Sequence, residues 1–327
     1  MSLQTTATPG KVAVGAVAAA GLLAVGRCAL ALLVDADLST WSARCRKSYF
    51  QDKVVWITGA SSGIGEEIAR QLDQLDVGIK LVLSSRRREP LEALAKTLTC
   101  DTAIVTCDLN DLDSLDKVAE DAIAAFGRID FLFNNGGVST RCFAEDTDFS
   151  VDVKVMTVDL LSYVKLTKLV LPGMIERKFG HIVNTSSLAG KLGMPLRTAY
   201  SAAKFAIIGH FDALRLEVAQ HNVHVTNVCP GSVQTEVARN ALTTTADKTF
   251  GAADKNIDNG MRVERCVNLF LAAVSNNIAE AWMFGSSKER LFSYLAVYMP
   301  GTFRKLTLMQ APKLMAQARK LTSEHTT

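Results

Sequence analysis

The chain has 327 residues, of which 48% are hydrophobic and 21% charged, and its formal net charge at pH 7 is +3. This balance is typical of a globular protein with a sizeable core. Acidic and basic residues are mixed along the chain, which argues against a nucleic-acid-binding protein. The seven cysteines are scattered and contain no Cys-x-x-Cys pair, so neither a disulfide framework nor a metal site is expected.

The N-terminal region, residues 1–49, contains a long apolar segment. Residues 12–34 carry one charge, Arg27, and are numerous enough to span a bilayer. We therefore predict a membrane anchor at 12–34. A cleaved signal peptide with a small-x-small site at Ala29-Leu-Ala31, a mitochondrial presequence and a buried helix remain alternatives.

Basic residues are unevenly distributed around this segment. Arg44, Arg46 and Lys47 follow it, whereas only Lys11 precedes it. The positive-inside rule therefore favours a body that faces the cytoplasm.

From about residue 52, short apolar runs alternate with helical patterns. We expect strands at 53–58, 79–84, 103–107, 130–134, 181–186, 223–228 and 281–284. Helices are expected at 63–76, 89–98, 151–177, 197–221 and 262–275, and a further helix, after the third strand, is expected to end at 126. Residues 235–261 are expected to form an irregular lid. Such alternation predicts βαβ units and a parallel sheet covered by helices on both faces. The fold class is thus α/β, a Rossmann-type, doubly wound, mainly parallel single domain over 50–287.

The C-terminal tail, residues 288–327, differs in character from the body. Residues 291–299 are apolar and aromatic, and 290–320 contain six basic residues and no acidic one. This combination favours a helix that lies in a membrane interface. A helix packed on its own domain, or on the partner in a homodimer, is an equal alternative.

A glycine-rich stretch, Thr58-Gly-Ala-Ser-Ser-Gly-Ile-Gly65, follows the first strand directly. Its glycines allow a sharp turn and a close approach to a pyrophosphate, which then faces the N-terminus of the next helix. No Lys-Ser/Thr pair follows the glycines, so the stretch is not a P-loop. It predicts a dinucleotide site.

The end of the second strand reads Ser84-Ser-Arg-Arg-Arg88. An acidic residue at this point would bind the 2′-hydroxyl of NAD, whereas a guanidinium such as that of Arg86 suits a 2′-phosphate. The sequence therefore favours NADP(H) as the cofactor.

Tyr200 and Lys204 are four residues apart in a predicted helix, so their side chains share one face. A lysine ammonium beside a phenol stabilises the phenolate, and such a phenol can exchange a proton with a carbonyl or an alcohol. Tyr49 and Lys53 have the same spacing, so the surrounding sequence must decide between the two pairs.

These motifs together resemble the short-chain dehydrogenase/reductase superfamily over nearly all of 50–287. The family's Thr-Gly-x-x-x-Gly-x-Gly pattern falls at 58–65, its Asn-Asn-Ala-Gly motif at 134–137 with a glycine for the alanine, and its Pro-Gly at 230–231. Its catalytic serine, thirteen residues before the tyrosine, matches Ser187, whereas Tyr49 has Ala36 at that spacing. The resemblance implies a cofactor site made of Gly59, Ser61, Ser62, Gly63, Ile64, Gly65, Arg86, Asp108, Leu109, Asn135, Tyr200, Lys204, Gly231, Val233 and Thr235.

Within the superfamily the chain is most similar to the membrane-associated dehydrogenase/reductase member 7 group. The apolar N-terminus, the Asn-Asn-Gly-Gly variant and the segments 54–59 and 174–178 carry this similarity. It implies NADPH-dependent reduction of lipophilic carbonyl compounds of the retinoid or steroid class, at the endoplasmic reticulum membrane.

One position departs from the family pattern. The fourth catalytic residue of the family is an asparagine in the long helix, and Asp159 occupies the matching position. Aspartate keeps an acceptor oxygen but lacks the amide donor, so proton supply is expected to be affected more than cofactor binding.

The resemblance assigns a role to each group. Tyr200 donates a proton to the substrate oxygen, Ser187 contacts and orients the same oxygen, and Lys204 holds the nicotinamide ribose. An NAD-linked alcohol dehydrogenase of the same fold, a non-catalytic NADP-binding membrane scaffold and a lipid-tethered interaction protein remain alternatives.

Overall fold

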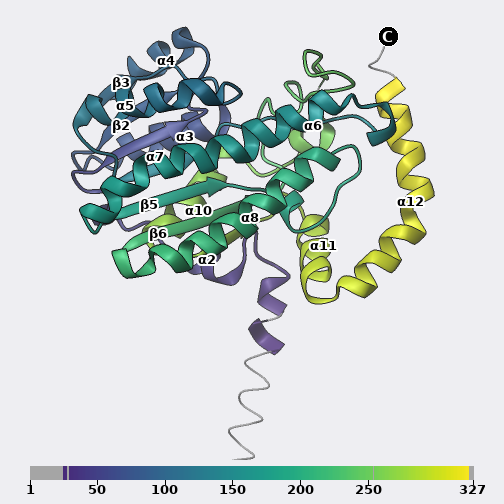
Figure 1. The fold of residues 1–327 in the computed structure, drawn as a ribbon. Coiled ribbons are helices and arrows are strands. Elements are labelled where there is room, and N and C mark those ends of the chain that lie inside the picture. Colours follow the sequence, from purple (N-terminus) through teal and green to yellow (C-terminus); the bar gives the residue numbers. More distant parts are fainter. Residues whose placement is uncertain (1–24, 28, 253, 324–327) are drawn as a thin grey trace, which may run out of the picture.

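The computed structural model of the chain describes residues 25–27, 29–252 and 254–323. Within these residues, seven strands form one parallel sheet in the order β3-β2-β1-β4-β5-β6-β7 (Figure 1). The strands are β1 (Val54–Thr58), β2 (Lys80–Ser84), β3 (Asp101–Ile104), β4 (Phe131–Asn134), β5 (Gly180–Thr185), β6 (Val223–Pro230) and β7 (Glu280–Met283). This arrangement confirms the predicted fold class.

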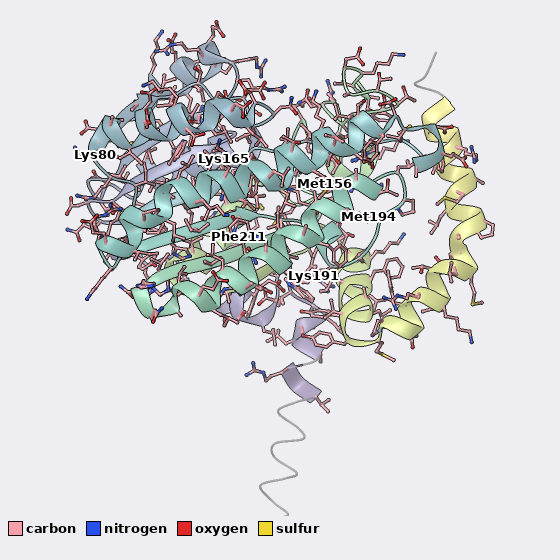
Figure 2. The ribbon with its side chains drawn as sticks, in the orientation of Figure 1. Lys80, Met156, Lys165, Lys191, Met194 and Phe211 are labelled. Atoms are coloured by element: carbon pink, nitrogen blue, oxygen red, sulfur yellow. The ribbon has the colours of Figure 1, made fainter. Side chains whose placement is uncertain are left out.

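Helices cover both faces of the sheet because successive strand residues point to opposite sides. Val55 and Ile57 pack in the apolar cluster that contains α3 (Gly63–Asp73), α4 (Arg88–Ala95) and α10 (Val263–Ser275). Val54 and Trp56 pack in the cluster that contains α5 (Leu115–Phe126), α7 (Ser162–Glu176) and α8 (Thr198–Val218). Phe211 of α8, labelled in Figure 2, is fully buried in this second cluster.

Shorter elements connect this framework. Before the sheet come α2 (Leu38–Ser42) and η1 (Lys47–Phe50), and between the main helices lie η2 (Leu112–Ser114), η3 (Ala144–Asp146), η5 (Leu188–Gly190), η6 (Ala219–His221) and α9 (Lys255–Asp258). The expected irregular segment 235–261 is largely without regular structure, apart from α9. It is fastened to the body by isolated bridges from Leu242 to Thr140 and from Met261 to Val233.

The single long helix predicted over 151–177 is wrong in one respect. The chain forms α6 (Phe149–Met156), then a π-helical turn, η4 (Thr157–Leu161), and then α7. The backbone N–H of Ser162 donates to the carbonyl of Thr157, one residue further back than in an α-helix. Periodicity cannot reveal such a turn, because it adds a single residue to a continuous helix.

The two ends of the chain lie outside the sheet. The predicted anchor at 12–34 falls mostly outside the described residues, and none of the helices that the structure does describe is long and apolar enough to cross a membrane. At the C-terminus, α11 (Ser287–Tyr298) and α12 (Pro300–Ser323) form an arc beside the body (Figure 1). Arg319 on α12 forms an ion pair with Glu145 of η3 and lies over the ring of Phe143.

Candidate active site

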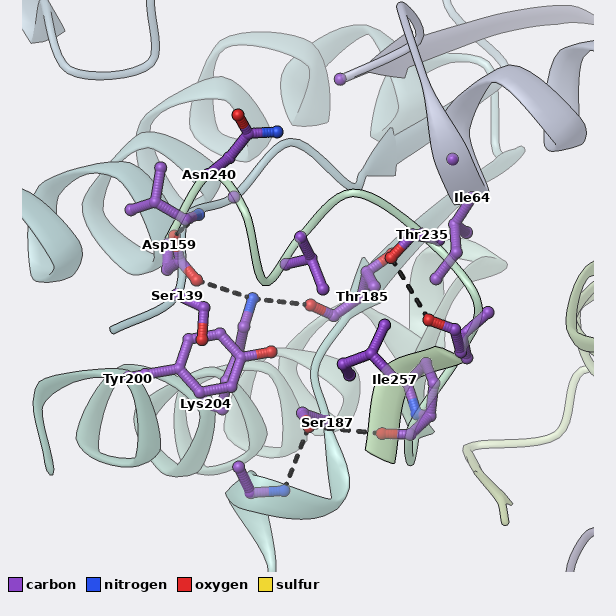
Figure 3. Close-up of a pocket in the computed structure, with 18 of the residues that line it drawn as sticks. Ile64, Ser139, Asp159, Thr185, Ser187, Tyr200, Lys204, Thr235, Asn240 and Ile257 are labelled. Carbon is purple, nitrogen blue, oxygen red and sulfur yellow. Dashed lines mark hydrogen bonds and ion pairs between the residues drawn. The ribbon is translucent and has the colours of Figure 1, made fainter. Parts of the chain in front are cut away.

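A cleft of about 990 Å³ lies at the carboxyl ends of the strands, where α/β sheets bind their ligands. Every predicted catalytic residue lines it, and so does every predicted cofactor residue except Gly65. Figure 3 shows Ser187, Tyr200, Lys204 and Asp159 around one part of this cleft. The structure thus brings together residues that are up to 176 positions apart, from Gly59 to Thr235.

The glycine loop after β1 has the backbone that the sequence predicted. Gly59 and Gly63 have φ values of +66° and +57°, a conformation that favours glycine. A Cβ atom at Gly59 would lie 2.5 Å from the Cα atom of Gly136. The loop therefore presents bare backbone to the cleft, as the close approach of a pyrophosphate requires.

Gly65 serves packing and does not line the cleft. A Cβ atom there would collide with the carbonyl of Gly59 and would lie 2.6 Å from the side-chain nitrogen of Asn135. Asn135 and Thr58 also hold the loop, since the hydroxyl of Thr58 accepts from the N–H of Asn135 at 3.0 Å. The third glycine thus lets α3 begin directly against the loop.

The far end of the cleft suits the adenosine half of a dinucleotide. Arg86 and Arg87 line it after β2, and Asp108 and Leu109 line it after β3. The Asp108 carboxylate accepts from the N–H of Asn110 at 2.9 Å, which fixes its orientation. The bare glycine backbone and these polar groups fit a nicotinamide dinucleotide.

The chemical groups meet where α8, η4 and the ends of β5 and β6 converge. The Lys204 ammonium donates to the carbonyl of Thr185 at 3.0 Å, and its nitrogen lies 5.4 Å from the centre of the Tyr200 ring. The Ser187 hydroxyl donates to the carbonyl of Pro230 at 3.3 Å and accepts from the N–H of Ala189 at 3.1 Å. The Lys204 and Ser187 side chains are therefore held by backbone carbonyls at the ends of β5 and β6.

Asp159 forms an ion pair with Lys204, at 3.0 Å between Oδ2 and Nζ, and both side chains are almost completely buried. Its other oxygen accepts from the N–H of Val138 at 2.7 Å. Burial raises the pKa of the Asp159 carboxyl, and the Lys204 charge and the Val138 N–H counteract part of that rise. Burial is the largest single effect on Lys204 and opposes its charge. The Asp159 carboxylate, together with Tyr163 and Tyr200, more than offsets burial and raises the lysine pKa above its usual value. Lys204 is therefore held as an ammonium.

Sequence reasoning anticipated the missing amide donor at Asp159 but not this direct ion pair. The pair depends on the π-helical turn, which places Asp159 against α8. The rival pair at Tyr49 lies near the opposite end of β5, where the Tyr49 hydroxyl donates to Asn277 at 2.7 Å and is 3.1 Å from His181 Nδ1.

Several cleft residues carry no motif and escaped the sequence analysis. Arg141 and Arg197 line the cleft, and both reach Asp254. Glu289 of α11 accepts from the N–H groups of Ser232 at 3.0 Å and Gly285 at 2.7 Å, so the tail is attached to the loop after β6. Their sequence signal is charge alone: Arg197 falls at the start of the expected helix 197–221, Asp254 in the expected irregular segment and Glu289 in the expected tail.

Comparisons with known proteins agree with this geometry. The profile of the family described as short chain dehydrogenase matches residues 53–246. Human dehydrogenase/reductase SDR family member 7 is 39% identical over 84% of this chain and 86% of its own length, and the bovine family member 7B is 36% identical over 82% and 84%. The expected similarity to the member 7 group is thereby confirmed.

Solved structures show the same fold. A short-chain dehydrogenase from Streptomyces avermitilis has a TM-score of 0.66 and 25% identity, covering 81% of this chain and 98% of its own. A short-chain dehydrogenase/reductase from Burkholderia phymatum in complex with NAD has a TM-score of 0.67 and 22% identity, covering 80% and 96%. The parallel sheet, the glycine loop and these relatives lead to one conclusion: the chain belongs to the short-chain dehydrogenase/reductase superfamily and is an oxidoreductase of that family.

Proposed function

We propose that the protein is an NADPH-dependent reductase of lipophilic aldehydes or ketones of the retinoid or steroid class. The observation that carries the proposal is the arrangement of Ser187, Tyr200 and Lys204 in the same cleft as the glycine loop. The relatives of the member 7 group are named dehydrogenase/reductase, and these names also support a redox reaction of this type.

The preference for NADPH rests on the end of β2. Arg86 and Arg87 line the cleft there, while Arg88 is engaged with Glu92 at 2.8 Å. Residues 84–88 contain no carboxylate that would repel a 2′-phosphate. Guanidinium groups suit a phosphate through paired hydrogen bonds.

The protein's own groups manage the substrate oxygen and its proton. When bound, the nicotinamide supplies the hydride that reduces the carbonyl carbon. The Tyr200 hydroxyl gives its proton to the carbonyl oxygen. The Ser187 hydroxyl, which now donates to Pro230, donates to that oxygen in place of the backbone carbonyl. Lys204 provides a fixed positive charge beside the phenol, and Asp159 keeps it charged.

Replacing Tyr200 with phenylalanine tests this role. We expect Tyr200→Phe to lower kcat for retinal or a ketosteroid by at least about 100-fold, the range typical of a lost general acid, while its Kd for NADPH stays unchanged. Turnover is followed by NADPH oxidation and Kd by fluorescence titration. Undiminished turnover in the variant would contradict the assignment, and the absence of turnover in the natural protein would favour a scaffold.

The same titration with NADH tests the cofactor. We expect NADPH to bind more tightly than NADH, and equal affinities would favour the NAD-linked alternative. A matched variant is Arg86→Gln, which should weaken NADPH binding without changing the affinity for NADH.

We also propose that an anionic membrane surface is a partner of α11 and α12. Leu308 and Met309 of α12 are more than two-thirds exposed, next to the exposed cations Arg304 and Lys305. Exposed apolar side chains beside basic ones are the composition of a helix that lies on a lipid surface. With a membrane anchor at 12–34, this surface would hold the body at the endoplasmic reticulum membrane.

A further inference from the structure

Two arginines that line the cleft, Arg141 and Arg197, share a single aspartate, Asp254. Nη2 of Arg141 lies 3.1 Å from Oδ2 of Asp254, and Nη2 of Arg197 lies 3.5 Å from the same oxygen. The three residues come from the loop after β4, the start of α8 and the segment before α9. None of them belongs to the residues with an assigned catalytic or cofactor role.

The two guanidinium groups are satisfied to different degrees. Arg141 is 5% exposed, and besides Asp254 it donates to the hydroxyl of Ser139 at 3.0 Å and to the carbonyl of Thr140 at 2.8 Å. With the residues that the structure describes, the Arg197 side chain makes only long contacts, at 3.5 Å to Asp254 and 3.7 Å to the sulfur of Met194. Arg197 therefore has donors to spare at the wall of the cleft.

The charges in this cluster do not balance. Two guanidinium groups face one carboxylate, which leaves one positive charge. Burial, and then the charge of Arg197, lower the pKa of Arg141 to about 10, in keeping with two cations held close together. Over the whole cleft, the described lining residues include eight cationic side chains (Arg86, Arg87, Arg141, Lys154, Arg197, Lys204, Lys255, Lys288) and four carboxylates (Asp108, Asp159, Glu236, Glu289).

The position of Arg197 relates this charge to the reaction. Arg197 precedes α8 directly and is three residues before Tyr200, so the two side chains start about one helical turn, roughly 5 Å, apart. Leu192, Met194, Phe292 and Leu314 also line the cleft and supply an apolar wall. A ligand at Tyr200 would therefore touch both apolar and cationic surface.

We propose that the cleft selects carbonyl compounds that carry a carboxylate on an apolar body, with the carboxylate bound by Arg197 and supported by Arg141. This inference rests on the proposed reductase function and states a preference within lipophilic carbonyl compounds: those with a carboxylate bind more tightly than uncharged ones such as retinal. A planar guanidinium pairs with a carboxylate through two parallel hydrogen bonds, which suits the spare donors of Arg197. The chemistry at the carbonyl is unchanged: the carbon gains the hydride, the oxygen gains the Tyr200 proton, and the carboxylate takes no part.

The test uses the full chain in detergent with NADPH and two probes, para-carboxybenzaldehyde and its uncharged methyl ester. We expect the carboxylate probe to have a KM about 10- to 100-fold below that of the ester, the range for a hydrogen-bonded charge pair. Arg197→Gln should abolish this difference by raising the KM of the carboxylate probe alone. Lys288→Gln, which removes another cation from the cleft wall, should preserve the difference.

Three possible results decide whether the inference holds. A similar KM rise for both probes in Arg197→Gln would mean that Arg197 only supports the cleft, and the inference would fall. Equal KM values for both probes in the natural protein would also overturn it. If neither the probes nor retinal are turned over, the reductase proposal fails, and calorimetry with the NADPH-loaded protein tests the carboxylate site by itself. Binding of the carboxylate probe that Arg197→Gln removes would uphold the carboxylate site, and absence of such binding would reject it.

Discussion

Asp159 shows how one residue changes the electrostatics of a familiar site. It stands where the family has an uncharged asparagine, and its carboxylate lies 3.0 Å from the Lys204 ammonium. A buried ion pair that is also hydrogen-bonded is hard to break, because either partner alone would be an unpaired buried charge. In the proposed mechanism, the groups behind Tyr200 therefore include a fixed ion pair.

We predict that Asp159→Asn makes Lys204 titrate at lower pH. The Asp159 carboxylate keeps the pKa of Lys204 above its usual value against the effect of burial, so without it burial lowers that pKa. A raised lysine pKa stabilises the fold at every pH below the unfolded value of about 10.5. The variant should lose about 3 kcal/mol of unfolding free energy, as expected for a broken buried pair. On the alkaline side of the pH–rate profile, its kcat should begin to fall at a lower pH than the kcat of the natural protein.

Urea unfolding and a pH–rate profile measure the two effects. Asp116→Asn is the matched control, because Asp116 pairs with Lys165 on the surface and such pairs contribute at most about 1 kcal/mol. An alkaline limb of the profile that does not move in Asp159→Asn would contradict the assigned role of the carboxylate.

Motifs whose residues lie within one element could be predicted from the sequence, whereas contacts between residues of different elements could not. Tyr200 and Lys204 share a helix face, and the glycine pattern specifies a local turn, so both motifs are readable from the sequence. Asp159 with Lys204, and Arg141 with Asp254, are 45 and 113 residues apart. Their contacts depend on the π-helical turn and on the course of 235–261, for which no local signal exists.

At the scale of elements, the glycine loop and α3 act as one unit. Gly65 allows the first turn of α3 to touch the loop, and Asn135 from the end of β4 donates to the carbonyl of Gly59 at 3.4 Å. The loop is therefore held from both sides. Its shape depends on the contact between helix and strand as much as on its own φ angles.

We predict that Gly65→Ala weakens NADPH binding at least about tenfold and destabilises the fold by about 1–3 kcal/mol, because the new methyl group overlaps the Gly59 carbonyl. Gly209→Ala is the control, since a Cβ atom at Gly209 of α8 meets nothing within 4 Å. That variant should gain about 0.5–1 kcal/mol from helix propensity and bind NADPH normally. Fluorescence titration and thermal unfolding measure both, and normal NADPH affinity in Gly65→Ala would refute the packing argument.

At the scale of the whole molecule, the predicted cofactor contacts and part of the apolar wall of the cleft come from different parts of the chain. The predicted nucleotide contacts come from the ends of strands in the sheet, whereas Leu314 reaches the cleft from α12. The outer surface of α12 carries exposed Leu308 and Met309 beside Arg304 and Lys305. One helix thus adjoins both the substrate cleft and the proposed lipid surface, which would let a lipophilic substrate pass directly from one to the other.

A shortened chain from Asp35 to Met299 lacks α12 and tests this division. The chain from Asp35 to Thr327 is its control. Loss of α12 should leave the Kd for NADPH unchanged, because Glu289 and the loop after β6 are retained. The KM for retinal should rise severalfold, since burial of one apolar side chain such as Leu314 contributes about 1.5–3 kcal/mol at most. Sedimentation with vesicles of anionic phospholipid should fall relative to the control, and high salt should weaken the binding of the control itself. If both chains sediment equally and reduce retinal with the same KM, α12 is neither the lipid contact nor part of the substrate path.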